Sequence, residues 1–209
     1  MLNRHARGLF TALFSPLARW LLKSGVSPDA VTVMGTIGVI IGGLILYPLG
    51  HLFWGTVVIA VFALSDVLDG IMARLNGPAG RWGNFLDSTL DRIADGAIFA
   101  GLAVWFFTDG ADRAAAVAAV VCLVLGMVVS YARAKAESLG FTANVGIAER
   151  AERLVSVLLV AGLTGLGLPS VVMVVTLTLL AIASLITVIQ RIATVHRQAL
   201  ADVDDGTAA

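Results

Sequence analysis

Long apolar runs separated by short polar breaks make up most of this chain. Six such runs lie at about residues 30–48, 54–74, 84–107, 114–137, 153–167 and 170–191. A helix needs about 20 apolar residues to cross a bilayer, and every run except the short fifth one is near that length. The pattern predicts an all-α integral membrane protein with six transmembrane helices.

A different pattern precedes the first run. Residues 2–24 mix apolar and basic side chains, and the apolar ones recur at helical spacing. This predicts an amphipathic helix lying in the headgroup layer, with a break or bend near Pro16, in preference to a disordered basic tail. Ser27, Pro28 and Asp29 then supply a capping hydroxyl, a first-turn proline and an acid at the positive end of the helix dipole, which predicts that the first span begins here.

Composition supports the membrane interpretation and gives an orientation. The 209 residues are 58% apolar and 13% charged, and their formal net charge is zero, so no global field favours nucleic acid. Basic residues gather at one end of the predicted spans, and in membrane proteins that end is cytoplasmic. Both termini are therefore expected in the cytoplasm. The residues concerned are Arg4, Arg7, Arg19, Lys23, Arg74, Arg81, Arg133, Lys135, Arg150, Arg153, Arg191 and Arg197.

Three segments follow from these patterns. Residues 1–25 form the predicted juxtamembrane helix, residues 26–197 the six-helix domain, and residues 198–209 a polar tail that we expect to be disordered. Gly38 and Gly42, four residues apart, are predicted to let helices pack closely.

Four aspartates occupy the cytoplasmic ends of the second and third spans. Asp66 and Asp69 share one helical face with Gly70 and Ala73, and Gly83, Asp87 and Asp91 share a face of the next helix. The residues between, which include Gly77, Pro78 and Gly80, must turn. Two antiparallel helices can therefore direct four carboxylates to one point near the cytoplasmic surface.

Such a cluster predicts a divalent cation, because ionisable groups at membrane depth are costly and usually functional. Oxygen ligands suit Mg²⁺, Mn²⁺ or Ca²⁺, and two such ions can clamp the entering and leaving oxygens of a phosphoryl transfer. Gly70 and Gly83 would let a bulky ligand approach the helix backbone, and Arg74 could reach a phosphate or an aspartate.

Two other interpretations compete with phosphoryl transfer. Simple ion pairing is disfavoured because Arg74 and Arg92 cannot neutralise four carboxylates. A divalent-cation transporter would place its site near the middle of the bilayer in broken helices, whereas these aspartates lie at its edge. A purely structural membrane protein belongs to the same alternative class.

The eight fixed positions of this motif, Asp66, Asp69, Gly70, Ala73, Arg74, Gly83, Asp87 and Asp91, resemble the signature of the CDP-alcohol phosphotransferases. The resemblance implies an enzyme that transfers a phosphatidyl group from a CDP-linked lipid to an alcohol and releases CMP. It implies that Asp66, Asp69, Asp87 and Asp91 bind metal, with two Mg²⁺ (or Mn²⁺) ions in each active site. It also implies that Asp91 accepts the proton of the attacking hydroxyl, and that the protein is a homodimer.

The resemblance further implies a donor site. CDP-diacylglycerol would contact the start of the first span and the glycine-rich faces of the motif. The residues implied are Asp29, Ala30, Val31, Thr32, Gly70, Ala73, Arg74, Gly80 and Gly83. Ordinary helix capping explains Asp29 almost as well.

Basic residues at the cytoplasmic ends of later spans bear on the acceptor alcohol. Positive-inside charge explains them, but Lys135, Arg153 and Arg191 could also form a pocket for a phosphorylated acceptor. Residues 132–137, 148–154 and 190–191 resemble the phosphatidylinositol phosphate synthases of actinobacteria, a subgroup of the same family. That resemblance implies inositol 1-phosphate as acceptor, bound through its phosphate by these three cations.

The predicted function is therefore metal-dependent transfer of a phosphatidyl group from CDP-diacylglycerol to inositol 1-phosphate, at a site facing the cytoplasm. A phosphatidylglycerophosphate synthase using glycerol 3-phosphate needs the same metals and a similar pocket, and it remains the main alternative. Asp95, one turn after Asp91, could orient inositol or pair with a base such as Arg153, and ion pairing is the simpler expectation.

Overall fold

The computed structural model describes residues 2–75 and 80–204, and it is helical with short connections. The predicted turn residues Gly77 and Pro78 lie outside the described residues, as do residues 205–209 of the predicted tail. The chain divides into two compact units, residues 1–98 and residues 99–209, with helix α5 continuing from the first into the second. Each unit is described by itself.

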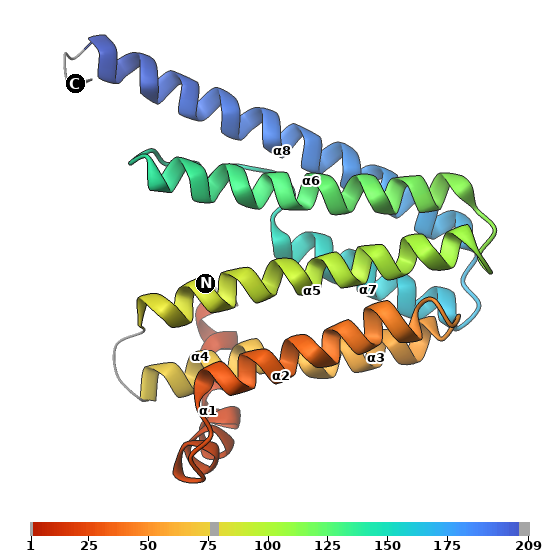
Figure 1. The fold of residues 1–209 in the computed structure, drawn as a ribbon, viewed down its shortest axis with the longest axis horizontal. Helices are drawn as coiled ribbons and strands as arrows, with labels where there is room; N and C mark the ends of the chain where they lie inside the picture. The colour runs from red at the N-terminus through yellow and green to blue at the C-terminus, as the bar shows by residue number, and fades with distance from the viewer. Residues whose placement is uncertain (1, 76–79, 205–209) are drawn as a thin grey trace. The chain divides into compact units, whose positions relative to one another are not determined.

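The first unit contains α1 (Leu2–Lys23), α2 (Pro28–Ile40), the π-helix η1 (Ile41–Leu46), α3 (Leu52–Ala63), α4 (Ser65–Leu75) and the beginning of α5 (Arg81–Phe107). Helix α2 packs along α3 and α4, and α1 packs on α4 (Figure 1). The predicted start of the first span is confirmed, because the Ser27 hydroxyl accepts a hydrogen bond from the Ala30 N–H at 3.2 Å.

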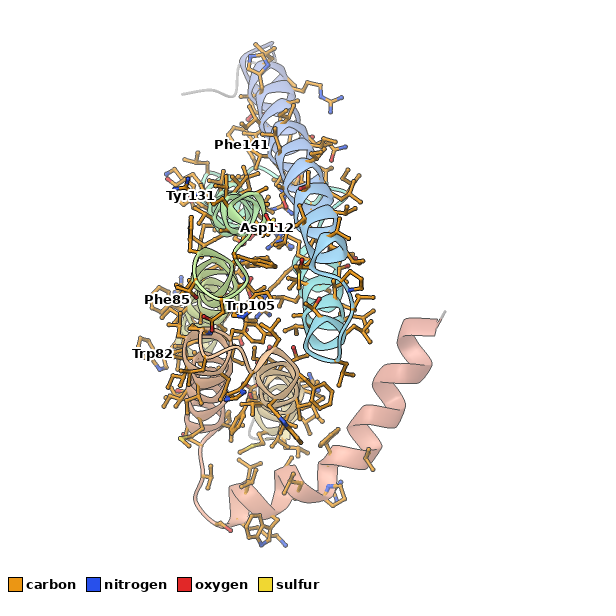
Figure 2. All side chains as sticks on the ribbon, turned by 90° about the vertical axis from the view of Figure 1, so that its right-hand side faces the viewer. Trp82, Phe85, Trp105, Asp112, Tyr131 and Phe141 are labelled. Atoms are coloured by element: carbon orange, nitrogen blue, oxygen red, sulfur yellow. The ribbon has the colours of Figure 1, made fainter. Side chains whose placement is uncertain are left out.

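Helix α1 continues through Pro16 without a break, and its axis bends in Figure 2. Ala18 is fully buried against Ile71 and Met72 of α4, whereas Leu13 and Trp20 remain exposed. The helix therefore braces the helix that carries Asp66 and Asp69 while keeping a second apolar face uncovered.

The close approach of α2 to its neighbours depends on glycine. A Cβ at Gly35 would overlap the Ser65 hydroxyl, and one at Gly38 would overlap the ring of Phe62. At Gly43 a Cβ would lie 2.7 Å from the carbonyl oxygen of Ala97 in α5. Any side chain at these positions would push the helices apart.

The second unit contains the end of α5, α6 (Arg113–Ser138), α7 (Arg150–Gly165) and α8 (Ser170–Asp204). Helix α8 lies along α6 and also packs on α7 (Figure 1). The prediction of disorder from residue 198 placed the end of ordered structure too early, since α8 continues to Asp204. Gln198 explains part of this order, because its Oε1 accepts from the Thr142 N–H at 2.9 Å and its Nε2 donates to the Thr142 carbonyl at 2.7 Å.

Four helical segments of the described residues are long and apolar enough to cross a membrane: Pro28–Leu46, Leu52–Leu75, Arg113–Ser138 and Ser170–Asp202. The remaining two predicted spans coincide with α5, whose first half carries the motif charges, and with α7, which has only 16 residues. Because these four segments can each cross a bilayer and the described elements are helices, the chain is an all-α, multi-pass membrane protein.

Candidate active site

The motif begins on α4, where Asp66 is exposed and Asp69 is only 8% exposed. Asp69 is buried because α2 covers it, and the Thr32 hydroxyl donates a hydrogen bond to Asp69 Oδ2 at 2.6 Å. Asp66 and Asp87 lie near enough to Asp69 to act on it electrostatically. Asp66 and Asp87 are thus near Asp69, and the convergence of all four motif carboxylates on one point stays a prediction.

The other two motif aspartates lie on α5, and both are partly buried. Arg92 Nη2 lies 3.5 Å from Asp91 Oδ2 and 3.9 Å from Asp95 Oδ2, so one guanidinium bridges both carboxylates. Asp95, whose partner the sequence left open, thus pairs with a base on its own helix. Sequence reasoning had counted Arg92 only as insufficient to neutralise the motif.

The type of these side chains fits a hard divalent cation, because each offers carboxylate oxygens and nothing softer. Their placement fits less closely. Among residues 2–75 and 80–204, no three carboxylate, imidazole or thiolate side chains lie close enough together to hold a metal ion as they stand. The four aspartates would have to draw together around a cation, which their mutual repulsion opposes until positive charge arrives.

The four predicted donor residues at the start of α2 have different surroundings. Trp82 of α5 donates its indole N–H to Asp29 Oδ2 at 3.1 Å. Ala30 is exposed, Val31 packs against the Ala18–Ile71–Met72 cluster, and Thr32 bonds to Asp69. Capping does not explain the Asp29 contact, because its carboxylate joins α2 to α5.

The motif glycines are open rather than packed. A Cβ at Gly70 would lie 3.6 Å from Arg74 Nη1, and one at Gly83 would lie 3.6 Å from Asp29 Oδ1. Gly80 has nothing within 4 Å of its Cβ position. Ala73 is half-buried and Arg74 exposed. These glycines therefore leave space beside the aspartates. At Gly35 and Gly38, in contrast, neighbouring side chains occupy the space that a Cβ would need.

The predicted acceptor residues all lie in the second unit. Lys135 is exposed near the end of α6, whereas Arg153 and Arg191 are 1% and 3% exposed. Arg153 Nη1 donates to the Ala148 carbonyl at 3.0 Å, and the guanidinium lies beside Gly126, where a Cβ would be 3.5 Å from Nη2. Arg191 donates through Nε to the Val145 carbonyl at 3.0 Å and through Nη1 to the Val129 carbonyl.

Both buried arginines therefore fasten the loop between α6 and α7. Thr187 contributes to the same attachment, because its hydroxyl oxygen accepts from the N–H groups of Ile147 and Ala148 at 3.2 and 3.1 Å. A Cβ at Gly146, whose φ is +150°, would collide with Thr187. Sequence reasoning did not identify these loop contacts, since a lone threonine in an apolar helix gives no periodic signal.

A family model described as CDP-alcohol phosphatidyltransferase matches residues 25–189. A curated phosphatidylinositol phosphate synthase from Streptomyces avermitilis is 50% identical over 215 residues, covering 100% of this chain and 88% of the relative. One from Mycolicibacterium smegmatis is 45% identical over 190 residues, covering 89% and 85%.

Solved structures give the same likeness. The phosphatidylinositol phosphate synthase of Mycobacterium tuberculosis with CDP-DAG bound has a TM-score of 0.85 and 44% identity, covering 88% of this chain and 94% of that one. The same enzyme in complex with manganese and citrate has a TM-score of 0.84 and 44% identity, covering 87% and 88%.

Proposed function

The chain belongs to the CDP-alcohol phosphatidyltransferase family, and we propose that it acts as a phosphatidylinositol phosphate synthase. In this reaction a hydroxyl of inositol 1-phosphate attacks the phosphorus that bears diacylglycerol in CDP-diacylglycerol, and CMP leaves. The observation that carries the proposal is the motif itself. All eight of its positions are present, and Asp66, Asp69 and Asp87 share one electrostatic neighbourhood.

Asp66, Asp69, Asp87 and Asp91 are proposed to hold two Mg²⁺ ions, which Mn²⁺ could replace. Their oxygen chemistry supports this assignment, and the manganese complex of the Mycobacterium tuberculosis relative supports divalent-metal dependence. When bound, such ions would offset the negative charge of the diphosphate and of the transition state.

Asp91 is proposed to accept the proton of the attacking hydroxyl. As oxygen bonds to phosphorus, the bond from phosphorus to the CMP oxygen breaks, and the hydroxyl proton passes to an Asp91 carboxylate oxygen. Arg92, the next residue on α5, has its Nη2 3.5 Å from Asp91 Oδ2 and can restrain the position of this carboxylate.

The donor nucleotide is proposed to bind over Asp29, Ala30, Val31, Thr32, Gly70, Ala73, Arg74, Gly80 and Gly83. The open space at Gly70 and Gly83 supports this placement, because a diphosphate could approach the helix backbone there. Arg74, exposed one turn after Gly70, can reach a phosphate oxygen.

Lys135, Arg153 and Arg191 are proposed to bind the phosphate of the acceptor. A guanidinium has five N–H donors, and the two carbonyl bonds of Arg191 leave donors available for a phosphate. The loop attachment and phosphate binding are therefore compatible, and a fixed loop would place the cations in advance.

The full membrane arrangement is also part of the proposal. Residues 1–25 lie on the membrane surface, and residues 26–197 form a six-span domain with both termini in the cytoplasm. The site then faces the cytoplasm from the bacterial plasma membrane, and the protein is a homodimer. Basic side chains at the cytoplasmic ends of the helices support this orientation.

The test is CMP release by the purified protein with CDP-diacylglycerol and Mg²⁺, comparing inositol 1-phosphate, glycerol 3-phosphate and free inositol. Release with inositol 1-phosphate alone is expected. Release with glycerol 3-phosphate alone would identify a phosphatidylglycerophosphate synthase and overturn the acceptor assignment. No release with any alcohol, together with metal flux in proteoliposomes, would favour the cation transporter.

A further inference from the structure

Thr32 makes a buried contact with a motif carboxylate from another helix. The residue is 8% exposed on α2, and its hydroxyl lies 2.6 Å from Asp69 Oδ2 on α4. The Thr32 oxygen also lies 3.1 Å from the carbonyl oxygen of Pro28, one turn earlier on α2.

A hydroxyl has one proton, so it cannot donate fully to both acceptors. The 2.6 Å distance is that of an O–H···O⁻ bond, in which the charged acceptor makes the bond shorter and stronger. The Pro28 carbonyl, at 3.1 Å, is the weaker acceptor and already receives a bond within the helix. The Thr32 proton is therefore directed to Asp69.

The contact depends on how closely α2 approaches α4. Gly35 follows Thr32 by three residues on the same helical face, and it admits the Ser65 side chain at the start of α4. A larger residue at 35 would move α2 away and lengthen the Thr32–Asp69 bond. Gly35, by allowing the close approach of α2, and the Thr32 hydroxyl, by donating its proton, therefore both help to hold the Asp69 carboxylate.

We infer that Thr32 is a positioning residue that orients the Asp69 carboxylate for a divalent cation. By holding Oδ2, it restricts the rotation of the carboxylate. Partners of this kind set the orientation and basicity of a ligand, and their loss typically weakens metal binding by about 10- to 100-fold. The inference rests on the proposed metal role of Asp69. It gives Thr32 a task distinct from nucleotide contact.

The test measures Mn²⁺ binding to the full-length purified protein by electron paramagnetic resonance, without CDP-lipid or acceptor. Thr32→Val removes the hydroxyl and keeps the shape, and Thr32→Ser restores the hydroxyl. Thr36→Val is the matched control, because Thr36 is buried one turn further on α2 and its hydroxyl bonds only to the Thr32 carbonyl at 3.0 Å. Asp69→Asn tests the metal role itself.

Thr32→Val is expected to weaken Mn²⁺ binding about 10- to 100-fold, with Thr32→Ser and Thr36→Val close to the unmodified protein. Thermal unfolding of the metal-free protein should shift more for Thr32→Val than for Thr36→Val, because only Thr32→Val leaves a buried carboxylate without its hydroxyl donor. Should Thr32→Val unfold, Thr32→Ala serves in its place, since alanine suits a helix.

The outcomes separate the two ideas. Unchanged Mn²⁺ binding in Thr32→Val, with binding lost in Asp69→Asn, would overturn the positioning role and leave the metal role intact. A raised CDP-diacylglycerol KM with unchanged Mn²⁺ affinity would assign Thr32 to the nucleotide instead. Unchanged binding in Asp69→Asn would refute the metal assignment itself.

Discussion

Trp82 donates its indole N–H to Asp29 Oδ2 at 3.1 Å, joining the beginning of α5 to the beginning of α2. The ring of Trp82 lies 5.9 Å from that of Phe85, and both project from the same region of α5 (Figure 2). A Cβ at Gly83, between them, would lie 3.6 Å from Asp29 Oδ1, at ordinary contact distance. A hydrogen bond between α2 and α5 thus lies at the proposed donor site.

Trp82→Phe keeps an aromatic ring but removes the N–H. Because a single hydrogen bond at an exposed site contributes about 1 kcal/mol, we expect the KM for CDP-diacylglycerol to rise roughly fivefold with little change in kcat. Steady-state kinetics at saturating acceptor would measure this. Phe85→Leu is the control, since it alters the ring pair without touching Asp29, and an equal rise in both variants would contradict the role of the bond.

Gly35 and Gly70 should respond oppositely to alanine. A Cβ at Gly35 would overlap Ser65, so Gly35→Ala should destabilise the protein by about 1–3 kcal/mol, seen as a lower thermal midpoint. A Cβ at Gly70 meets only Arg74 Nη1 at 3.6 Å, so Gly70→Ala should fold as well as before. That variant should instead raise the donor KM, because its methyl group occupies space assigned to the diphosphate. Normal donor KM in Gly70→Ala would remove the glycine from the donor site.

Asp91→Asn should lose turnover by about 10²- to 10⁴-fold, the usual effect of removing a general base. Binding of CDP-diacylglycerol should be largely retained, because three other aspartates remain. Asp95→Asn is the matched control one turn away, since it shares Arg92 but faces no proposed proton transfer. Rapid-quench measurement of CMP formation separates the two. Near-normal turnover in Asp91→Asn would eliminate the proton-acceptor role.

Hydropathy predicted the helices well where an apolar run begins beside a residue that caps a helix, as at Ser27 and Asp112. Ser27 caps α2 as its sequence position suggested. The second run, however, is two helices, with α3 ending at Ala63 and α4 beginning at Ser65. That division occurs where Ser65 meets Gly35, and such a contact between distant segments leaves no trace in local periodicity.

The π-helical turn of η1 escaped sequence analysis for a similar reason. Tyr47 donates its N–H to the Gly42 carbonyl five residues earlier, and Gly43 lies against the backbone of α5 at Ala97. A widened turn changes no residue type, so it follows only from packing.

The aspartates were predictable because charge in an apolar run is conspicuous. Whether Arg191 bonds to a ligand or to a carbonyl could not be read from the chain, since the residue type suits both.

Alanine variants of Lys135 and Arg153 should distinguish acceptor binding, seen in the acceptor KM, from attachment of the α6–α7 loop, seen in thermal stability. Lys135 is exposed, so Lys135→Ala should raise the KM for inositol 1-phosphate about tenfold or more while leaving thermal stability unchanged. Arg153 is buried and bonded to the Ala148 carbonyl, so Arg153→Ala should raise the acceptor KM and also destabilise the protein by about 2–3 kcal/mol.

Arg133 supplies the control for both variants. It lies two residues before Lys135 on α6, and it is exposed and paired with Glu137 at 2.9 Å, so Arg133→Ala removes a nearby cation outside the proposed pocket. Kinetics with varied acceptor and fixed donor would show whether the effect is local. If Arg133→Ala raised the acceptor KM as much as Lys135→Ala, the acceptor would be responding to diffuse positive charge. An unchanged KM in Arg133→Ala, with the donor KM constant in all three variants, would instead locate acceptor recognition at Lys135 and Arg153.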